Sequence, residues 1–160
     1  PLRWAIVETP TMATRAAKLS QGRFDAVSDI AAGVEALGHV DLVHASSSIQ
    51  YMPEPLAALQ SLAALRPRCL ALLRFPWWMG PQTVGLQPST LAGNGIGPLP
   101  PGMADREITY PVTFTNFNDV LRTLSDFEIA LVVPSPSSIY ELRGQKILGI
   151  SVIFRLKDSH

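Results

Sequence analysis

Apolar and polar residues alternate along the chain in blocks that predict strands and helices in turn. Short apolar runs bounded by turn-forming residues predict strands at residues 2–8, 24–29, 40–46 and 69–75. Alanine- and leucine-rich segments between these runs predict helices at residues 12–19, 30–37 and 56–65. Strands that alternate with helices at this spacing are typical of a parallel sheet built from right-handed crossovers.

The pattern changes in the second half of the chain. Glycine and proline are dense at about residues 76–111, which predicts a long loop, either a functional lid or a disordered insertion. A helix follows at residues 117–125, which Asn116 or Asn118 can cap. The last strands, at residues 127–133 and 149–156, are joined by a segment too polar for a crossover helix. We therefore expect them to form an antiparallel pair.

Size and charge narrow the class of protein. The chain has 160 residues, 47% of them apolar, which is enough for one domain with a continuous core. Lys and Arg number 13, as do Asp and Glu, so the formal net charge is zero. This balance argues against a nucleic-acid partner and against a membrane surface, because both attract strongly basic proteins.

Two further features of the composition indicate a cytoplasmic protein. No apolar run approaches the ~18 to 20 residues of a membrane-spanning helix, and no secretory leader opens the chain. The single cysteine, Cys69, cannot form an internal disulfide, which fits a reducing compartment.

The residues at the ends of the predicted strands are the candidates for a binding site, since ligands of open α/β sheets bind beyond the carboxyl ends of the strands. Glu8 can accept two hydrogen bonds from a ribose diol, or it is an ordinary solvated acid. Asp29 can accept a hydrogen bond from an adenine amino group, but capping of the helix that begins at Ile30 is the preferred reading. The small residues Ser46 and Ser47 let a ligand approach the backbone, or they form a polar loop.

Arg74 ends the next strand, and Trp77 follows it directly. Trp77 is expected either to form an apolar wall of an acceptor pocket or to pack on the body of the domain. The sequence has no G-x-S-x-G turn and no clustered histidine, cysteine and acidic residues, so neither a hydrolase triad nor a metal site is expected. Catalytic residues cannot be assigned.

Three segments in this order resemble a family of class I methyltransferases. They are Trp-Ala-Ile-Val-Glu-Thr-Pro at residues 4–10, Asp-Leu-Val-His-Ala-Ser-Ser-Ser-Ile-Gln-Tyr-Met-Pro-Glu-Pro at residues 41–55, and Leu-Leu-Arg-Phe-Pro at residues 72–76. The resemblance covers residues 2–156. It implies a Rossmann-like, mostly parallel sheet with helices on both faces, an antiparallel strand at its end, S-adenosylmethionine as cofactor and methyl transfer to an unidentified small acceptor, for which a sugar-like molecule is one candidate.

The resemblance also implies roles for particular residues. Glu8 would hold the ribose hydroxyls, and Asp29 and Ile30 would border the adenine. Ser46 and Ser47 would line the methionine end of the cofactor. The acceptor side would be formed by Gln50, Tyr51, Arg74 and Trp77.

One departure from the family pattern matters. A complete member carries a first strand and a glycine-rich loop before the segment that opens this chain, and both are missing here. We expect this strand to be central in the sheet, supplied by residues that precede Pro1 or by another chain, the former being preferred. The chain is therefore interpreted as most of a methyltransferase domain.

Two other functions fit the same pattern. A Rossmann-like protein without catalytic activity, serving as an interaction or regulatory module, would show the same fold signals. A dinucleotide oxidoreductase could use Glu8 on the ribose of NAD, although residues 46–51 favour the methyltransferase. The sequence leaves open whether copies of the chain associate into a homo-oligomer.

Overall fold

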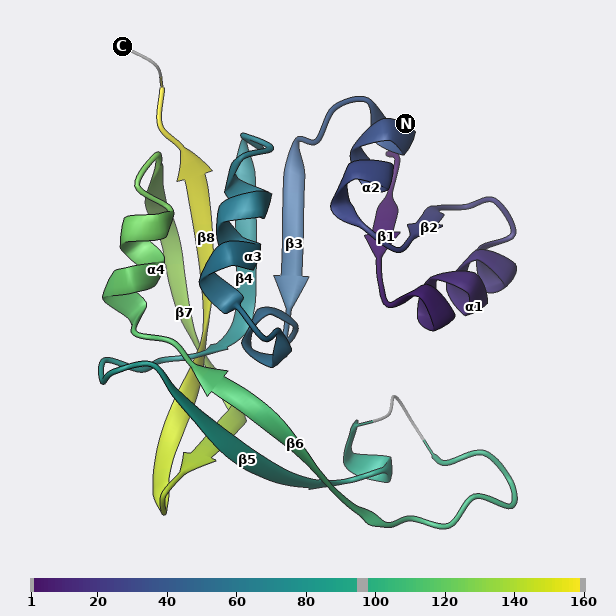
Figure 1. Ribbon diagram of the computed structural model, residues 1–160, viewed down its shortest axis with the longest axis vertical. Helices are drawn as coiled ribbons and strands as arrows, with labels where there is room; N and C mark the ends of the chain where they lie inside the picture. Colours follow the sequence, from purple (N-terminus) through teal and green to yellow (C-terminus); the bar gives the residue numbers. More distant parts are fainter. Residues whose placement is uncertain (1, 95–97, 159–160) are drawn as a thin grey trace.

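The computed structural model describes residues 2–94 and 98–158. Its N-terminal unit consists of β1 (Ala5–Val7), α1 (Pro10–Ser20), β2 (Asp25–Val27) and α2 (Ile30–Leu37). β1 and β2 form a parallel pair of their own, with Ala5 opposite Asp25. This unit lies beside the rest of the molecule (Figure 1) and makes at most sparse contacts with it. The helices and strands predicted for residues 2–37 are confirmed.

The main sheet has four strands in the order β3-β4-β8-β7. These strands are β3 (Leu42–Ser46), β4 (Cys69–Pro76), β7 (Phe127–Leu142) and β8 (Gln145–Leu156). β3 and β4 are parallel, whereas β8 is antiparallel to both of its neighbours. The predicted antiparallel C-terminal pair is confirmed, and both strands are longer than the apolar runs indicated.

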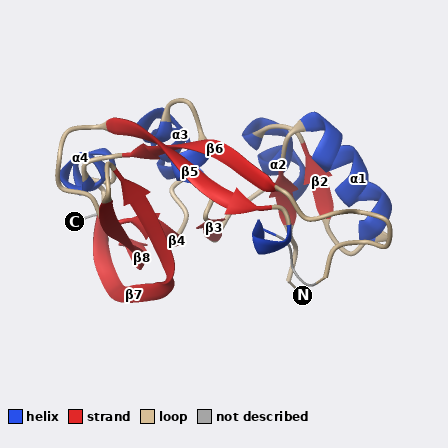
Figure 2. Cartoon of the chain, turned by 90° about the horizontal axis from the view of Figure 1, so that it is seen from below, coloured by secondary structure: helices blue, strands red, loops and turns tan. Residues whose placement is uncertain are grey.

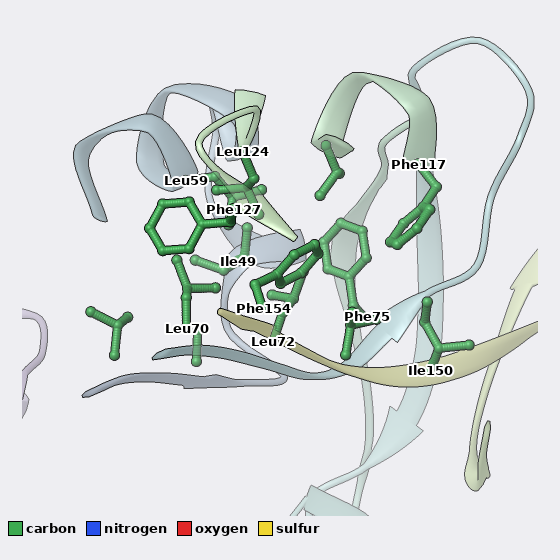
Figure 3. Packing of buried hydrophobic residues seen from close by; sticks show 14 residues of the cluster. Ile49, Leu59, Leu70, Leu72, Phe75, Phe117, Leu124, Phe127, Ile150 and Phe154 are labelled. Atoms are coloured by element: carbon green, nitrogen blue, oxygen red, sulfur yellow. The ribbon is translucent and has the colours of Figure 1, made fainter. Parts of the chain in front are cut away.

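Helices α3 (Pro55–Ala63) and α4 (Phe117–Thr123) pack on the main sheet and form the core with it (Figures 1 and 3). Phe75 of β4 and Leu59 of α3 are fully buried there. The side chain of Asn116 accepts a hydrogen bond from the Asn118 backbone N–H at 2.9 Å, which confirms Asn116 as the cap of α4. A short 3-10 helix, η1 (Ile49–Tyr51), joins β3 to the loop that leads into α3.

Residues 76–111, predicted to be a loop, contain most of a two-stranded ribbon instead. β5 (Thr83–Thr90) and β6 (Glu107–Phe114) pair in antiparallel fashion, and η2 (Ala92–Asn94) follows β5. Residues 95–97 of the predicted lid lie outside the described residues. The ribbon extends from the main sheet to the side where the N-terminal unit lies (Figures 1 and 2). A second apolar cluster, which includes Phe114 of β6 and Leu142 of β7, fastens its base to the hairpin of β7 and β8.

The predicted fold class, a mostly parallel Rossmann-like sheet with helices on both faces, is wrong. Three of the five strand pairings in the described part of the chain are antiparallel, and the strands belong to three separate sheets. The expected antiparallel pair at the C-terminus does not account for this: β5 and β6, predicted to be a loop, form a further antiparallel pair, and β1 and β2 do not join the main sheet. In the expected pair, β7 reaches β8 through two residues only, Arg143 and Gly144, which is too short for a parallel crossover. Both have positive φ, 51° and 80°, as a tight hairpin turn requires. α3 and α4 share one core with the main sheet, and α1 and α2 pack against the separate β1–β2 pair.

The expectation that the strands form a single sheet belongs to the same correction, whereas the missing first strand stays a prediction. β1 pairs only with β2, and β3 pairs only with β4, so each ends its own sheet within the described residues. β1 and β3 run in the same direction in Figure 1.

Candidate functional site

A network of hydrogen bonds lies at the carboxyl ends of the parallel strands β3 and β4. Gln50, in η1, is 1% exposed. Its side-chain Nε2 donates to the hydroxyl oxygen of Tyr140 at 2.8 Å and to the carbonyl oxygen of Arg74 at 3.2 Å. The Tyr140 hydroxyl in turn donates to the same Arg74 carbonyl. Three segments far apart in the sequence are thereby joined through buried side chains.

Arg74 and Ser47 have unusual backbone conformations at this point. Both have positive φ, 53° and 48°, although neither is glycine, and Arg74 lies within β4 where its pairing with β8 is irregular. Such a conformation costs an ordinary residue about 1 to 2 kcal/mol. It is maintained here because the Ser47 N–H donates to the Leu73 carbonyl at 3.0 Å and the Gln50 network holds Arg74. The side chain of Arg74 extends to β3, where its Nε donates to the Ser46 hydroxyl at 3.3 Å.

Two further tyrosines complete the site. Tyr51, beside Gln50 in η1, meets Tyr110 of β6 edge to face, with ring centroids 5.4 Å apart at 81°. We refer to the whole group as the strand-end cluster; it consists of Ser46, Ser47, Gln50, Tyr51, Arg74, Tyr110 and Tyr140. Within the described residues, the Oε1 atom of Gln50 is buried without a hydrogen-bond partner. The cluster can therefore offer hydroxyl donors, one buried acceptor and one guanidinium to a ligand.

Burial in the cluster favours the protonated forms of the Tyr51 and Tyr140 phenols. Burial raises the pKa of Tyr51 above the ordinary value of 10.0, and the neighbouring phenols of Tyr140 and Tyr110 add to the rise. Burial also raises the pKa of Tyr140, partly opposed by hydrogen bonds and by Arg74. At neutral pH both hydroxyls are hydrogen-bond donors and carry no charge.

These shifts predict a loss of stability in alkali. Above the unfolded-state value of 10.0, unfolded tyrosines release protons that the folded chain retains, so the free energy of unfolding falls as pH rises. Urea titrations between about pH 9 and pH 11 should show this fall, and Tyr51→Phe should make it shallower. The same slope in Tyr51→Phe and in the original chain would show that Tyr51 does not contribute.

The residues predicted to bind the adenosine part of a cofactor all belong to the N-terminal unit. Asp29 caps α2, since its Oδ1 accepts from the Ala32 N–H at 2.8 Å, which is the preferred reading of that residue. Ile30 begins the same helix and is half-buried. Glu8 follows β1, is exposed, and accepts from the Thr9 N–H at 3.2 Å. The structure thus places these three residues together in the N-terminal unit. The strand-end cluster, in contrast, belongs to η1, the main sheet and the β5–β6 ribbon.

Trp77 is not part of the strand-end cluster. Its ring packs on Phe117 at the start of α4, with centroids 4.7 Å apart, and its backbone N–H donates to the Leu148 carbonyl at 2.8 Å. The side chain remains 42% exposed. Packing on the body of the protein, one of the two alternatives for Trp77, is therefore observed.

Sequence reasoning missed Tyr110 and Tyr140. Both lie in segments that were interpreted as loops, within residues 76–111 and 134–148. A period-two alternation was available in the second segment, where Tyr140 and Leu142 are buried and Glu141 between them is exposed. It was hidden by the serines and prolines that precede it.

Two observations bear on other kinds of site. In the described part of the chain, no three histidine, cysteine or acidic side chains are grouped so that they could hold a metal ion. None of the helices described there is long and apolar enough to cross a membrane.

The sequence matches no protein-family model, and a search of curated proteins finds no significant match. The resemblance to class I methyltransferases therefore stays a prediction.

Proposed function

We propose that this chain binds S-adenosylmethionine and takes part in methyl transfer to a small acceptor. The observation that carries the proposal is the strand-end cluster itself. Two segments that the sequence singled out, Ser46 to Tyr51 and the strand end at Arg74, come together at the carboxyl ends of two parallel strands. The proposal rests on this site and not on the corrected fold class.

The residues present fit such a ligand. The buried Oε1 of Gln50 has no partner within the described chain, so a ligand donor can satisfy it. Ser46 and Ser47 have small side chains at the end of β3, which permits close approach to the backbone. Glu8 has a carboxylate that can accept from both hydroxyls of a ribose. S-adenosylmethionine supplies an electrophilic methyl group, so this chain needs chiefly to bring an acceptor into line.

The roles of the residues follow from that requirement. The neutral hydroxyl of Tyr51 donates a hydrogen bond that orients an acceptor without adding charge, while the Tyr140 hydroxyl donates to the Arg74 carbonyl and holds the site together. The rings of Tyr51 and Tyr110 form an aromatic wall beside it. Since no cluster member is an ordinary general base, we expect orientation to account for most of the rate enhancement.

Calorimetric titration with S-adenosylmethionine and with NAD tests the proposal. Binding of S-adenosylmethionine alone supports it. Binding of NAD alone would favour an oxidoreductase. Binding of neither would favour the alternative of an interaction or regulatory module without catalytic activity.

Glu8→Ala should weaken the binding of S-adenosylmethionine by ~1 to 3 kcal/mol, because the ribose would lose its charged acceptor. The measurement is the calorimetric dissociation constant of each variant. Glu35→Ala is the matched control, since Glu35 is an exposed acid on α2 of the same unit and follows no strand. An equal effect of both substitutions would remove Glu8 from the site.

A further inference from the structure

Arg74 is the one charged member of the strand-end cluster. Its guanidinium takes part in none of the four ion pairs found among the described residues. Its Nε is occupied by the Ser46 hydroxyl, and the residue is exposed, so the terminal N–H groups are accessible from solvent. An exposed arginine is often no more than a solvated surface residue, so its placement needs a second observation.

The backbone of Arg74 supplies that observation. Arg66 and Arg143 also have positive φ, but they lie in chain reversals, after α3 and between β7 and β8. Arg74 alone of the three lies within a strand. Its carbonyl is held by two buried side chains, and its N–H donates to the Ser151 hydroxyl at 3.4 Å. A strained conformation that buried partners maintain is characteristic of functional positions.

The surroundings of the guanidinium favour a negative ligand. No member of the cluster is a carboxylate, so nothing within it neutralises the positive charge. The Ser46 hydroxyl, which accepts from the Arg74 Nε, adds a neutral donor beside it. A planar guanidinium offers paired N–H groups that match two oxygens of a carboxylate or a phosphate.

We infer that Arg74 binds a carboxylate or phosphate group carried by the small acceptor. That the negative group belongs to the methyl acceptor rests on the proposed function. The existence of an anion site at Arg74 is independent of that function. The acceptor is then an acidic molecule, for example one bearing a carboxylate or a phosphate ester, and Arg74 selects it over neutral analogues. Gln50 and Tyr140 act as positioning residues, because they hold the backbone from which the guanidinium extends.

The test uses the full chain without cofactor. Sodium malonate and sodium phosphate are titrated separately at constant ionic strength, and backbone amide signals are followed by NMR. We expect saturable shifts at Ser46, Ser47 and Arg74 with at least one anion, and the anion that binds identifies the acidic group. Arg74→Gln should weaken this binding about tenfold or more, and Arg74→Lys should weaken it less. Sodium chloride alone should give no saturable shift.

Arg143→Gln is the matched control, since Arg143 is also exposed, has positive φ and lies outside the cluster. It should bind both anions as the original chain does. Absence of saturation with either anion, or equal affinity in Arg74→Gln, would overturn the inference.

A parallel titration with S-adenosylmethionine separates this inference from the proposed function. Arg74→Gln should weaken that affinity much less than it weakens anion binding, because the acidic group belongs to the acceptor and only the contact of Arg74 with Ser46 is lost on the cofactor side. An equal loss of affinity for S-adenosylmethionine and for malonate would instead assign Arg74 to the cofactor and overturn the acceptor assignment. If S-adenosylmethionine did not bind the original chain at all, the proposed function would fail, while the malonate and phosphate titrations would still decide the anion site.

Discussion

Phe154→Ala is expected to lower the free energy of unfolding by about 3 to 5 kcal/mol. Phe154 is 1% exposed and lies in the middle of the labelled side chains of Figure 3. It pairs across the sheet with Leu70 of β4 on one side and with Ile129 of β7 on the other. Truncation to alanine removes contacts within the core and leaves a cavity. The surrounding helices and sheet are closely packed, so they relax only partly and do not fill it.

The loss is large because single domains are stable by only about 5 to 15 kcal/mol. Urea unfolding followed by circular dichroism measures it. Leu131→Ala on the neighbouring strand is the control, since Leu131 is 53% exposed, and it should change the free energy by less than about 0.5 kcal/mol. Similar effects of the two substitutions would contradict the position of the core.

Gly149→Ala should destabilise the protein by about 3 kcal/mol, the upper part of the range for overpacking. A Cβ atom at Gly149 would lie 2.6 Å from Cβ and 2.8 Å from the carbonyl oxygen of Ser138. Ser138 lies where β7 bulges between Ser135 and Ile139, and its carbonyl oxygen belongs to the backbone, so relief of the clash requires the bulge itself to change shape next to the pair of Ile139 with Leu148. The nearby ring of Tyr140, 3.5 Å away, would transmit the strain to the strand-end cluster.

Gly33→Ala provides the contrasting case. A Cβ at Gly33, inside α2, would meet only side-chain atoms at 3.5 Å or more, which is ordinary van der Waals contact. Alanine favours the helix over glycine by about 0.5 to 1 kcal/mol, so this substitution should stabilise the protein. Thermal unfolding of both variants tests the pair. Equal melting temperatures for Gly149→Ala and the original chain would show that β7 yields at Ser138.

The strand-end cluster shows how a candidate site can depend on residues that no local pattern links. Ser46 and Ser47 lie at the end of an apolar run, so the position of a strand end was sufficient to single them out, and the resemblance to methyltransferases added Gln50 and Tyr51. Tyr140 is 90 residues from Gln50, and a serine- and proline-rich segment precedes it. Nothing in the local sequence connects these two residues.

The local pattern of the chain determined most of the individual elements. All four α-helices of the described chain begin within two residues of their expected positions, because a helix is stabilised by local features, namely its own periodicity and its cap. The antiparallel pairing of β7 and β8 was likewise predicted, since a short connection excludes a parallel crossover. The local role of Asp29 as a helix cap also followed from the sequence alone.

Only the tertiary structure decided how these elements are grouped. Strands pair through backbone hydrogen bonds, which every residue type except proline can make in the same way. The division into three sheets and the predominance of antiparallel pairings therefore could not be predicted from the apolar runs. The ribbon of β5 and β6 depends on the anchoring of Phe114 against Tyr140 and Leu142, a contact between distant segments. The hydrogen bonds to the Arg74 carbonyl have the same origin. The buried side chains that donate them, and thereby stabilise the strained backbone of Arg74, lie far from it along the chain, and only folding brings them to it.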